Sequence, residues 1–319
     1  MTNLTAPHFT NEDKAREHLE ALRWPEGPFC PHCGSFNAKR LPAQRGRPTK
    51  AHPEGAVRNG VVQCRDCRKQ FSVTVGTVFE GSKVPLHKWL LATHLLCASK
   101  KGMSAHQLHR MLGITYKTAW FMFHRIREAM RDESGEQFGG GGGMVEVDET
   151  YIGRDRTKEQ KAGGGSHKLK VLTLVDRDTG RARSVTFDNF RKEEVGPIVR
   201  NNIAREAVLM TDEAGMYRGL ATMHGGHKIV THGKGEYVNR DDATIHTNTI
   251  EGYFSIFKRG MKGVYQHCGK QHLHRYLAEF DFRYSNRVAH GVDDAMRANL
   301  ALKGIAGRRL FYRRPNFAA

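Results

Sequence analysis

The sequence of 319 residues contains no run of 18 apolar residues and no positively charged leader followed by an apolar stretch. The first absence excludes a membrane-spanning helix and the second argues against secretion, so we expect a cytoplasmic protein with no membrane partner. Cysteine is scarce as well, with six residues in the chain. A disulfide framework is therefore a poor interpretation, and the two isolated cysteines, Cys97 and Cys268, are predicted to be small buried hydrophobic side chains.

Acidic residues are also few, because 33 Asp and Glu face 51 Lys and Arg, which gives a net charge of +18. Residues 1–140 hold 21 basic and 12 acidic side chains and residues 141–319 hold 30 and 21, so each part carries half of the excess. The charge does not come from a basic tail. A basic surface on both parts is typical of proteins that bind a polyanion, most often nucleic acid, although many basic proteins only present solvated Lys and Arg.

Four of the cysteines form two C-x-x-C pairs, in CPHC and CRDC, after an amphipathic helix predicted over residues 10–24. Two such pairs can supply the four thiolates of a tetrahedral zinc site. The 30 residues between the pairs exceed the usual spacing and are rich in Gly, Pro and basic residues. This composition predicts a mobile insertion, and it leaves a redox or accidental pairing open. The predicted ligands of a structural Zn²⁺ are Cys30, Cys33, Cys64 and Cys67.

Residues 86–131 are predicted to be helical, with SAHQLHRMLGITYKTAWFMFHRIREAM at their centre. A glycine, Gly113, interrupts the apolar periodicity, and Thr115 can cap a second helix. This is a helix-turn-helix pattern, although two packed helices with a glycine turn are also common in purely structural bundles. The outward residues of the second helix that are predicted to contact DNA are Tyr116, Lys117, Thr118 and Arg125.

The second part of the chain differs in kind and follows the run QFGGGGG, residues 137–143, which is predicted to be a flexible linker. Three strand patterns come first, then a helix around residues 191–205, then further strands and helices. This order predicts an α/β domain with a mixed sheet, of the ribonuclease H-like kind. Between its first two strands, the polar segment 153–168 is predicted to be a basic flexible loop.

Two aspartates, Asp148 and Asp212, each follow an apolar strand pattern. A carboxylate at a strand end can point into a cleft, and two brought together repel unless a cation neutralises them. Such hard oxygen ligands suit Mg²⁺ or Mn²⁺. The alternative is that both are solvated strand-end acids. Their neighbours Glu149 and Glu213 are predicted to point to the opposite faces, where they either support the ligands from outside the metal site or are solvated.

The segment HTNTIEGYFSIFKRG holds three further groups that could ligate a metal, His246, Asn248 and Glu251. An Asn followed three residues later by Glu is also a capping pattern, so Asn248 is either the cap of a long helix or a ligand. Glu251 lies near the start of this helix. Lys258 lies two turns beyond it on the same face, where it could hold a DNA phosphate.

These features together resemble the DDE transposases of bacterial insertion sequences, and more narrowly the ISXO-like type, which has a zinc ribbon before a ribonuclease H-like, integrase-type core. The resemblance is carried by CPHCG, QCRDCRKQFSVTVGTVFEGSKVPLHKW, the helical segment through TYKTAWFMFHRIR, VEVDETYIG, MTDEAGMY, HTNTIEGYFSIFKRGMKGVYQH and HLHRYLAEFDFRYSNR. It covers roughly residues 15–305, and so many motifs in one order are specific. The long basic insertion departs from the family pattern and leaves the shape of the ribbon open.

The resemblance implies that Asp148, Asp212 and Glu251 form a metal-binding triad with Lys258 as the associated basic residue, and it keeps Asn248 as an alternative ligand. It implies two catalytic Mg²⁺ or Mn²⁺ ions and one structural Zn²⁺, with DNA cleavage and joining by two-metal phosphoryl transfer. The implied partners are double-stranded DNA, as terminal inverted repeats and as target, and further copies of the chain in a dimer or larger oligomer. Arg259 is a further predicted DNA contact. The expected location is the bacterial cytoplasm, with the nucleoid.

A catalytically silent, transposase-derived DNA-binding regulator is the alternative function, and such a protein would be expected to have lost one of the acids. The predicted organisation has five parts. They are an N-terminal helix with a zinc ribbon (1–80), a helix-turn-helix-like DNA-binding region (81–136), a glycine linker (137–143), a ribonuclease H-like catalytic domain (144–305) and a basic C-terminal tail (306–319).

Overall fold

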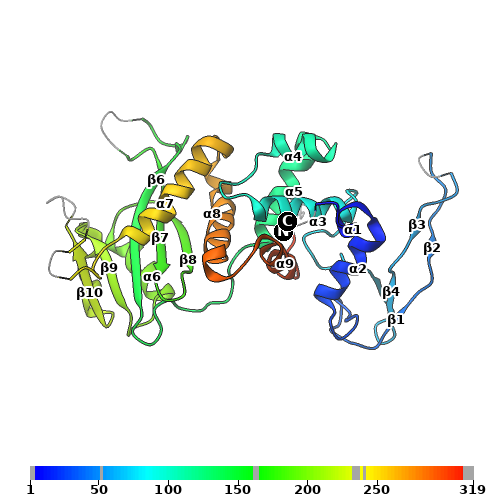
Figure 1. Cartoon of the computed structure of the whole chain (residues 1–319), viewed down its shortest axis with the longest axis horizontal. Helices are drawn as coiled ribbons and strands as arrows, with labels where there is room; N and C mark the ends of the chain where they lie inside the picture. Colours follow the sequence, from blue (N-terminus) through cyan, green and yellow to red (C-terminus); the bar gives the residue numbers. More distant parts are fainter. Residues whose placement is uncertain (1–3, 51–52, 161–164, 232–237, 240–241, 312–319) are drawn as a thin grey trace, which may run out of the picture. The chain divides into compact units, whose positions relative to one another are not determined.

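The structure is a computed structural model that describes residues 4–50, 53–160, 165–231, 238–239 and 242–311 (Figure 1). The chain divides into two compact units. Unit 1 is assembled from three separate segments, residues 1–98, 105–130 and 294–319, and unit 2 comprises residues 99–104 and 131–293.

Unit 1 begins with helices α1 (Pro7–Thr10) and α2 (Glu12–Arg23). The side chain of Asn11 caps α2 by accepting a hydrogen bond from the backbone N–H of Lys14 at 3.0 Å. The predicted amphipathic helix is therefore confirmed, and its apolar stripe is buried through Ala15 and Leu19.

The cysteine pairs lie beside a three-stranded antiparallel sheet made of β1 (Ala38–Arg40), β4 (Val62–Cys64) and β5 (Gln70–Phe71), in the order β1-β4-β5. The first pair precedes β1, Cys64 ends β4, and Cys67 lies in the turn before β5. The insertion between the pairs contains a second ladder, β2 (Gln44–Arg45) with β3 (Val57–Arg58). The described part of this insertion thus includes paired strands, where the sequence analysis expected a mobile segment. Residues 51 and 52 lie outside the described residues.

The helical part of unit 1 consists of α3 (Leu86–Ala98), α4 (Ala105–Leu112), α5 (Tyr116–Ala129) and α9 (Asp294–Lys303). Gly113 has φ +60°, which lets the chain turn between α4 and α5 at the position where the periodicity breaks. Thr115 then caps α5 by accepting from the N–H of Thr118 at 3.2 Å. The helix–turn–helix arrangement is formed as predicted.

Helix α9 belongs to unit 1, whereas the sequence analysis placed residues up to 305 in the catalytic domain. The buried guanidinium of Arg297 donates to the carbonyl of Cys97 in α3 at 2.9 Å and pairs with Asp294 at 2.7 Å. After α9, Arg308 donates to the carbonyl of Glu128 in α5. An amphipathic helix pattern shows which face is apolar but not which core it joins, so sequence could not place this boundary.

Unit 2 is built on a five-stranded mixed sheet in the order β10-β9-β6-β7-β8. Strand β7 (Leu169–Asp176) is antiparallel to both of its neighbours, β6 (Met144–Ile152) and β8 (Ala182–Phe187). Strands β9 (Val208–Asp212) and β10 (Gly226–Val230) continue the sheet in parallel with β6. The predicted helices plus mixed sheet are confirmed.

Helices cover both faces of this sheet (Figure 1). Val145 and Val147 of β6 pack with α6 (Lys192–Asn202), whereas Ile152 packs with α7 (Asn248–Gly260) and α8 (Lys270–Ser285). Because side chains alternate along a strand, the even-numbered residues of β6 face α7. Short helical turns lie at Gly215–Tyr217, Leu220–Thr222, Met261–Tyr265 and Val288–His290.

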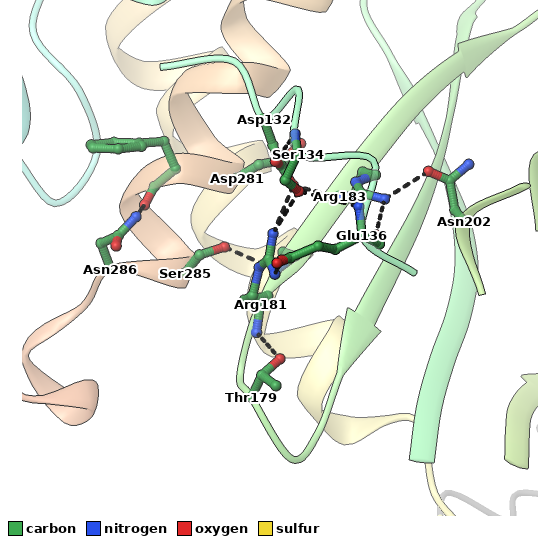
Figure 2. Close-up of polar contacts among 12 residues, drawn as sticks. Asp132, Ser134, Glu136, Thr179, Arg181, Arg183, Asn202, Asp281, Ser285 and Asn286 are labelled. Atoms are coloured by element: carbon green, nitrogen blue, oxygen red, sulfur yellow. Dashed lines mark hydrogen bonds and ion pairs between the residues drawn. The ribbon is translucent and has the colours of Figure 1, made fainter. Parts of the chain in front are cut away.

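The segment that enters unit 2 is held against β8 by charged side chains (Figure 2). Arg183 lies 2.6 Å from the carboxylate of Asp132, and Arg181 contacts Asp132 at 2.9 Å and Glu136 at 2.5 Å. Burial of Asp132 favours the neutral acid, but the hydrogen bond from Arg183 and others hold its pKa below the usual value. These pairs attach residues 132–136 to the sheet.

The glycine-rich run 137–143 is a bonded part of unit 2 and not the flexible linker that its composition predicts. Phe138 is buried and exchanges backbone hydrogen bonds with Asn202 at 2.8 Å and Ala204 at 2.9 Å. Gly139 donates to the buried carboxylate of Asp176 at 3.0 Å and has φ +73°. A Cβ on Gly139 would lie 2.5 Å from the Cβ of Ala207, so glycine here permits a close approach of the backbone.

None of the helices in the described ranges is both long enough and apolar enough to span a membrane.

Candidate active site

Two aspartates meet where strands β6 and β9 separate. The parallel pairing of these strands ends at Glu146 and Met210, and Asp148 and Asp212 lie two residues further along each strand. The shared register brings the two aspartates opposite each other just beyond the last paired residues. Carboxylate oxygens of Asp148, Glu149 and Asp212 lie within 4.8 Å of one another.

Glu149 reaches this cluster from the other side of the sheet. It alternates with Asp148 along β6, and its carboxylate accepts a hydrogen bond from the hydroxyl of Tyr217, a member of the core on the α6 side, at 2.5 Å. Strand alternation predicted that Glu149 would support the ligands from outside the metal site or be solvated. Its carboxylate lies in one cluster with those of Asp148 and Asp212, beyond the last paired residue Glu146, so its place outside the ligand set stays a prediction.

The cluster of acids is electrostatically unfavourable without a cation. Burial, reinforced by the negative charges of Glu149, Asp212 and Glu251, raises the pKa of Asp148 to about 8, although a hydrogen bond from the Glu149 N–H opposes the shift. Burial likewise raises the pKa of Glu149 despite the hydrogen bond from Tyr217. A set of carboxylate oxygens at this spacing has the donor chemistry that Mg²⁺ and Mn²⁺ prefer.

Helix α7 carries Glu251 in its first turn, but the predicted capping box is not formed. The helix begins at Asn248, and the N-cap position is Thr247, whose side chain makes no capping hydrogen bond. The backbone N–H of Glu251 bonds to the carbonyl of Thr247 at 3.1 Å, as in any first helical turn. Asn248 is exposed and is the first helical residue, so the capping role predicted for it is wrong.

The cap of α7 comes from strand β6 instead. Glu146 is fully buried, and its Oε2 accepts a hydrogen bond from the backbone N–H of Ile250 at 2.8 Å. Its Oε1 lies 2.5 Å from Nε of Arg177. Sequence reasoning missed both residues. The available signal was an acid two positions before Asp148, and hence on the same face of the strand.

The basic residues of α7 differ in their surroundings. Lys258 is half-buried, with its ammonium over the ring of Phe254 at 5.6 Å from the centroid. Arg259 is exposed, and its Nε donates to the carbonyl of Ser255 at 3.0 Å. Before the helix, the Nδ1 of His246 lies 2.8 Å from Nη2 of Arg177, which uses this nitrogen within the protein.

A second candidate metal site lies in unit 1. The sulfur atoms of Cys30 and Cys67 are 3.6 Å apart, as are those of Cys33 and Cys64, and all four lie within 4.8 Å of one another. A tetrahedral Zn²⁺ with bonds of about 2.3 Å requires sulfur atoms about 3.8 Å apart. The four cysteines therefore fit a zinc ion.

Both cysteine pairs turn the chain in the same way. Gly34 and Arg68 each follow the first cysteine of their pair by four residues, and both have positive φ, +75° and +60°. Backbone N–H groups of Cys67 and Asp66 lower the pKa of the Cys64 thiol to about 7. For Cys33, the backbone hydrogen bond at Ser35 is outweighed by burial and the neighbouring sulfur atoms, which raise its pKa to about 12, so a bound cation must displace protons from this cluster. Of the two isolated cysteines, Cys97 is buried as predicted, whereas Cys268 is only half-buried.

Both regions match known families. Residues 141–285 match the ISXO2-like transposase domain, and residues 10–70 match the transposase zinc-ribbon domain. By these two matches the chain has the domains of an ISXO2-like transposase. This transposase is also 28% identical over 293 residues to an uncharacterized protein in transposable element ISH50 of Halobacterium salinarum, across 86% of this chain and 91% of the relative. The acid cluster lies in the first matched domain and the four cysteines in the second.

Within the transposase, the residues predicted to contact DNA from α5 do not share one environment. Tyr116 and Lys117 are exposed and Thr118 is partly exposed, all in the first turn of the helix. Arg125 is 6% exposed and donates to the carbonyl of Glu80 at 2.6 Å. It lies nine residues after Tyr116 and so on the opposite face of the helix, which makes its prediction as a DNA contact wrong.

Proposed function

We propose that this transposase binds the terminal inverted repeats of its insertion sequence and catalyses metal-dependent strand cleavage and strand transfer. The observation that carries the proposal is the meeting of Asp148 and Asp212 at the separation of β6 and β9, with Glu251 close enough to raise the pKa of Asp148. The proposal includes a ribonuclease H-like core. Three antiparallel strands, then a helix and two parallel strands, match the order expected for that fold.

We assign the metal-binding roles to Asp148, Asp212 and Glu251. When bound, two Mg²⁺ or Mn²⁺ ions supply activation of the attacking oxygen and stabilisation of the leaving oxygen. Asp148 would contact both, because its carboxylate senses the charges of the other two acids. Glu251 is preferred over Asn248 because it adds negative charge to the site. Glu149, whose carboxylate accepts a hydrogen bond from Tyr217, either supports the ligands from outside the metal site or is itself a further oxygen ligand.

DNA contacts are proposed on both units. In unit 2, Lys258 and Arg259 lie two turns beyond Glu251, about 10 Å along the helix, where phosphates beside the reacting bond would pass. In unit 1, Tyr116, Lys117 and Thr118 form the accessible first turn of α5, and such first turns contact base edges in helix-turn-helix proteins. Acting on two element ends requires a multimer of the transposase. The zinc ribbon holds a structural Zn²⁺ on its four cysteines.

A cleavage assay tests the proposal, using duplexes that carry the element's terminal repeat and Mn²⁺ as the ion. We expect Asp148→Asn, Asp212→Asn and Glu251→Gln each to lower cleavage and strand transfer by at least about a thousandfold while repeat binding remains within a few-fold. Glu213→Gln, an exposed acid beside Asp212, is the matched control and should retain activity. A triad variant that still cuts DNA at the wild-type rate would remove that residue from the site.

A further inference from the structure

Glu146 and Arg177 connect the strand that carries Asp148 to the helix that carries Glu251. Glu146 precedes Asp148 by two residues on the same face of β6, and it accepts the backbone N–H of Ile250, the residue directly before Glu251. The first turn of a helix has unpaired N–H groups and a partial positive charge, so a buried carboxylate there is both a hydrogen-bond acceptor and a counter-charge. The N-cap residue Thr247 makes no side-chain cap bond, and Nδ1 of His246, itself held by Arg177, accepts the backbone N–H of Asn248 at 3.3 Å.

Arg177 extends the connection to the loop before α7. Its Nε pairs with Glu146 at 2.5 Å, its Nη1 donates to the carbonyl of Thr244 at 2.5 Å, and its Nη2 donates to the carbonyl of His246 at 2.5 Å. Arg177 follows the end of β7, and its own backbone N–H bonds to Met144 at the start of β6 at 3.0 Å. Arg177, directly after β7, therefore joins β6 to the loop that precedes α7.

We propose that Glu146 and Arg177 are positioning residues for the catalytic metal site, which set the distance of Glu251 from Asp148 and Asp212. The inference rests on the proposed function, because it assumes that Glu251 is a metal ligand. The physical reason is that Glu251 is exposed in the first turn of a helix, where its backbone is held by few intrahelical bonds. Without an external anchor, that turn would fray, and the third carboxylate would lose its aim at the other two.

Glu146 and Arg177 are largely shielded from solvent, so few other side chains could replace them with the same contacts. The Glu146 side chain is 0% exposed and that of Arg177 13% exposed. Arg177 offers three nitrogen atoms in a rigid plane to acceptors on β6 and on the loop before α7, a geometry that a lysine cannot reproduce. Outer residues that orient metal ligands typically change metal affinity by about 10–100-fold when they are replaced.

Calorimetric titration of the full-length chain with Mn²⁺ tests this inference. We expect Glu146→Gln and Arg177→Lys each to weaken Mn²⁺ binding by about 10–100-fold. Strand cleavage should fall at low Mn²⁺ and recover at saturating Mn²⁺, because the ligands themselves remain. The matched control is Glu279→Gln, since Glu279 is also 0% exposed and pairs with an arginine, Arg283, at 2.8 Å in the same unit. It should lower thermal stability by a similar amount without changing Mn²⁺ affinity.

The outcomes separate the two proposals. If Glu146→Gln and Arg177→Lys fold and bind Mn²⁺ with wild-type affinity while Glu251→Gln binds it weakly, the positioning role is overturned and the proposed function stands. Equal weakening by Glu279→Gln would also overturn it, since general destabilisation would explain the loss. If Asp148→Asn and Glu251→Gln leave Mn²⁺ binding unchanged, the proposed function itself fails. Should Glu146→Gln not fold, Arg177→Lys carries the same test, because it keeps the charge and the Ile250 cap.

Discussion

At the scale of single residues, the site brings together carboxylates from opposite faces of one strand. Asp148 and Glu149 are neighbours on opposite faces of β6, yet their carboxylates lie in one cluster with Asp212. The cause is the opening of the sheet after Glu146, which provides a free strand edge. Burial together with like charges then stabilises the protonated form of Asp148.

The raised pKa of Asp148 predicts a pH dependence of metal binding. Below pH 8 the ion-free protein holds a proton on Asp148 that a divalent cation must displace, so Mn²⁺ affinity should increase by about tenfold per pH unit up to about pH 8 and level off above it. Calorimetry in buffers of different ionisation enthalpy should record proton release on binding. An Mn²⁺ affinity that does not change between pH 6 and pH 8 would contradict a raised pKa of Asp148.

The raised pKa of Asp148 also determines how the stability of the ion-free protein changes with pH. The folded-state pKa of Asp148 is raised above its usual value of 3.8, so the folded state binds the proton more tightly than the unfolded chain. The contribution of Asp148 to the free energy of unfolding of the ion-free protein therefore decreases as the pH rises from about 4 to about 8. Saturating Mn²⁺ should remove this decrease.

At the scale of elements, composition and local structure disagree most at the glycine-rich run 137–143. We predict that Gly139→Ala destabilises the protein by about 2–4 kcal/mol, because the new Cβ would lie within 2.8 Å of Ala207 and Val145 and the backbone has positive φ. Gly140→Ala has open space and should change stability by less than about 0.5 kcal/mol. Denaturant unfolding measures both. If the two variants are equally stable, the run is a free linker after all.

The zinc ribbon gives a second prediction at this scale. Purified transposase should contain one Zn²⁺ per chain. The Cys64→Ser variant should lose this ion, and its three-stranded sheet, in which β4 is the central strand, should unfold because structural zinc sites contribute directly to folding. Cys97→Ser, at a buried cysteine outside the cluster, should retain zinc. Metal analysis by mass spectrometry distinguishes the two. Zinc retained at wild-type level in Cys64→Ser would contradict the four-cysteine site.

The elements that were predictable from sequence are those whose signal is local. Periodicity and a polar cap located α2 and the turn between α4 and α5, and apolar runs located the strands that carry Asp148 and Asp212. Strand β9 ends at Asp212 as predicted, but β6 continues beyond Asp148 to Ile152. The cap of α7 was not predictable, because it comes from Glu146, 104 residues away from Ile250 in the chain. Arg125 was misplaced for a related reason. Helical periodicity locates the apolar face, but a long basic side chain can also be buried against Trp89 when a carbonyl accepts its hydrogen bond.

At the scale of the whole molecule, the chain passes out of unit 1 into unit 2 and returns with α9. Sequence analysis divided the chain into consecutive domains, and tertiary packing does not follow that order. Truncation after residue 293 should therefore loosen unit 1, since α9 packs on α3 and Arg297 bonds to the carbonyl of Cys97. We expect faster hydrogen exchange in α3 and unchanged exchange in β6 and β7. Truncation after residue 311 is the control. Faster exchange confined to unit 2 would contradict the assignment of α9.

The proposed function requires that Asp148, Asp212 and Glu251 together hold the catalytic ions. Anomalous diffraction from crystals of the transposase soaked in Mn²⁺ tests it most directly, because manganese scatters anomalously and its oxygen ligands can be read from their distances. We predict an anomalous peak between Asp148 and Asp212 with a Glu251 oxygen within about 2.5 Å of a bound ion when DNA is present. A peak whose ligands include Asn248 in place of Glu251, or no peak between the two aspartates, would contradict the account.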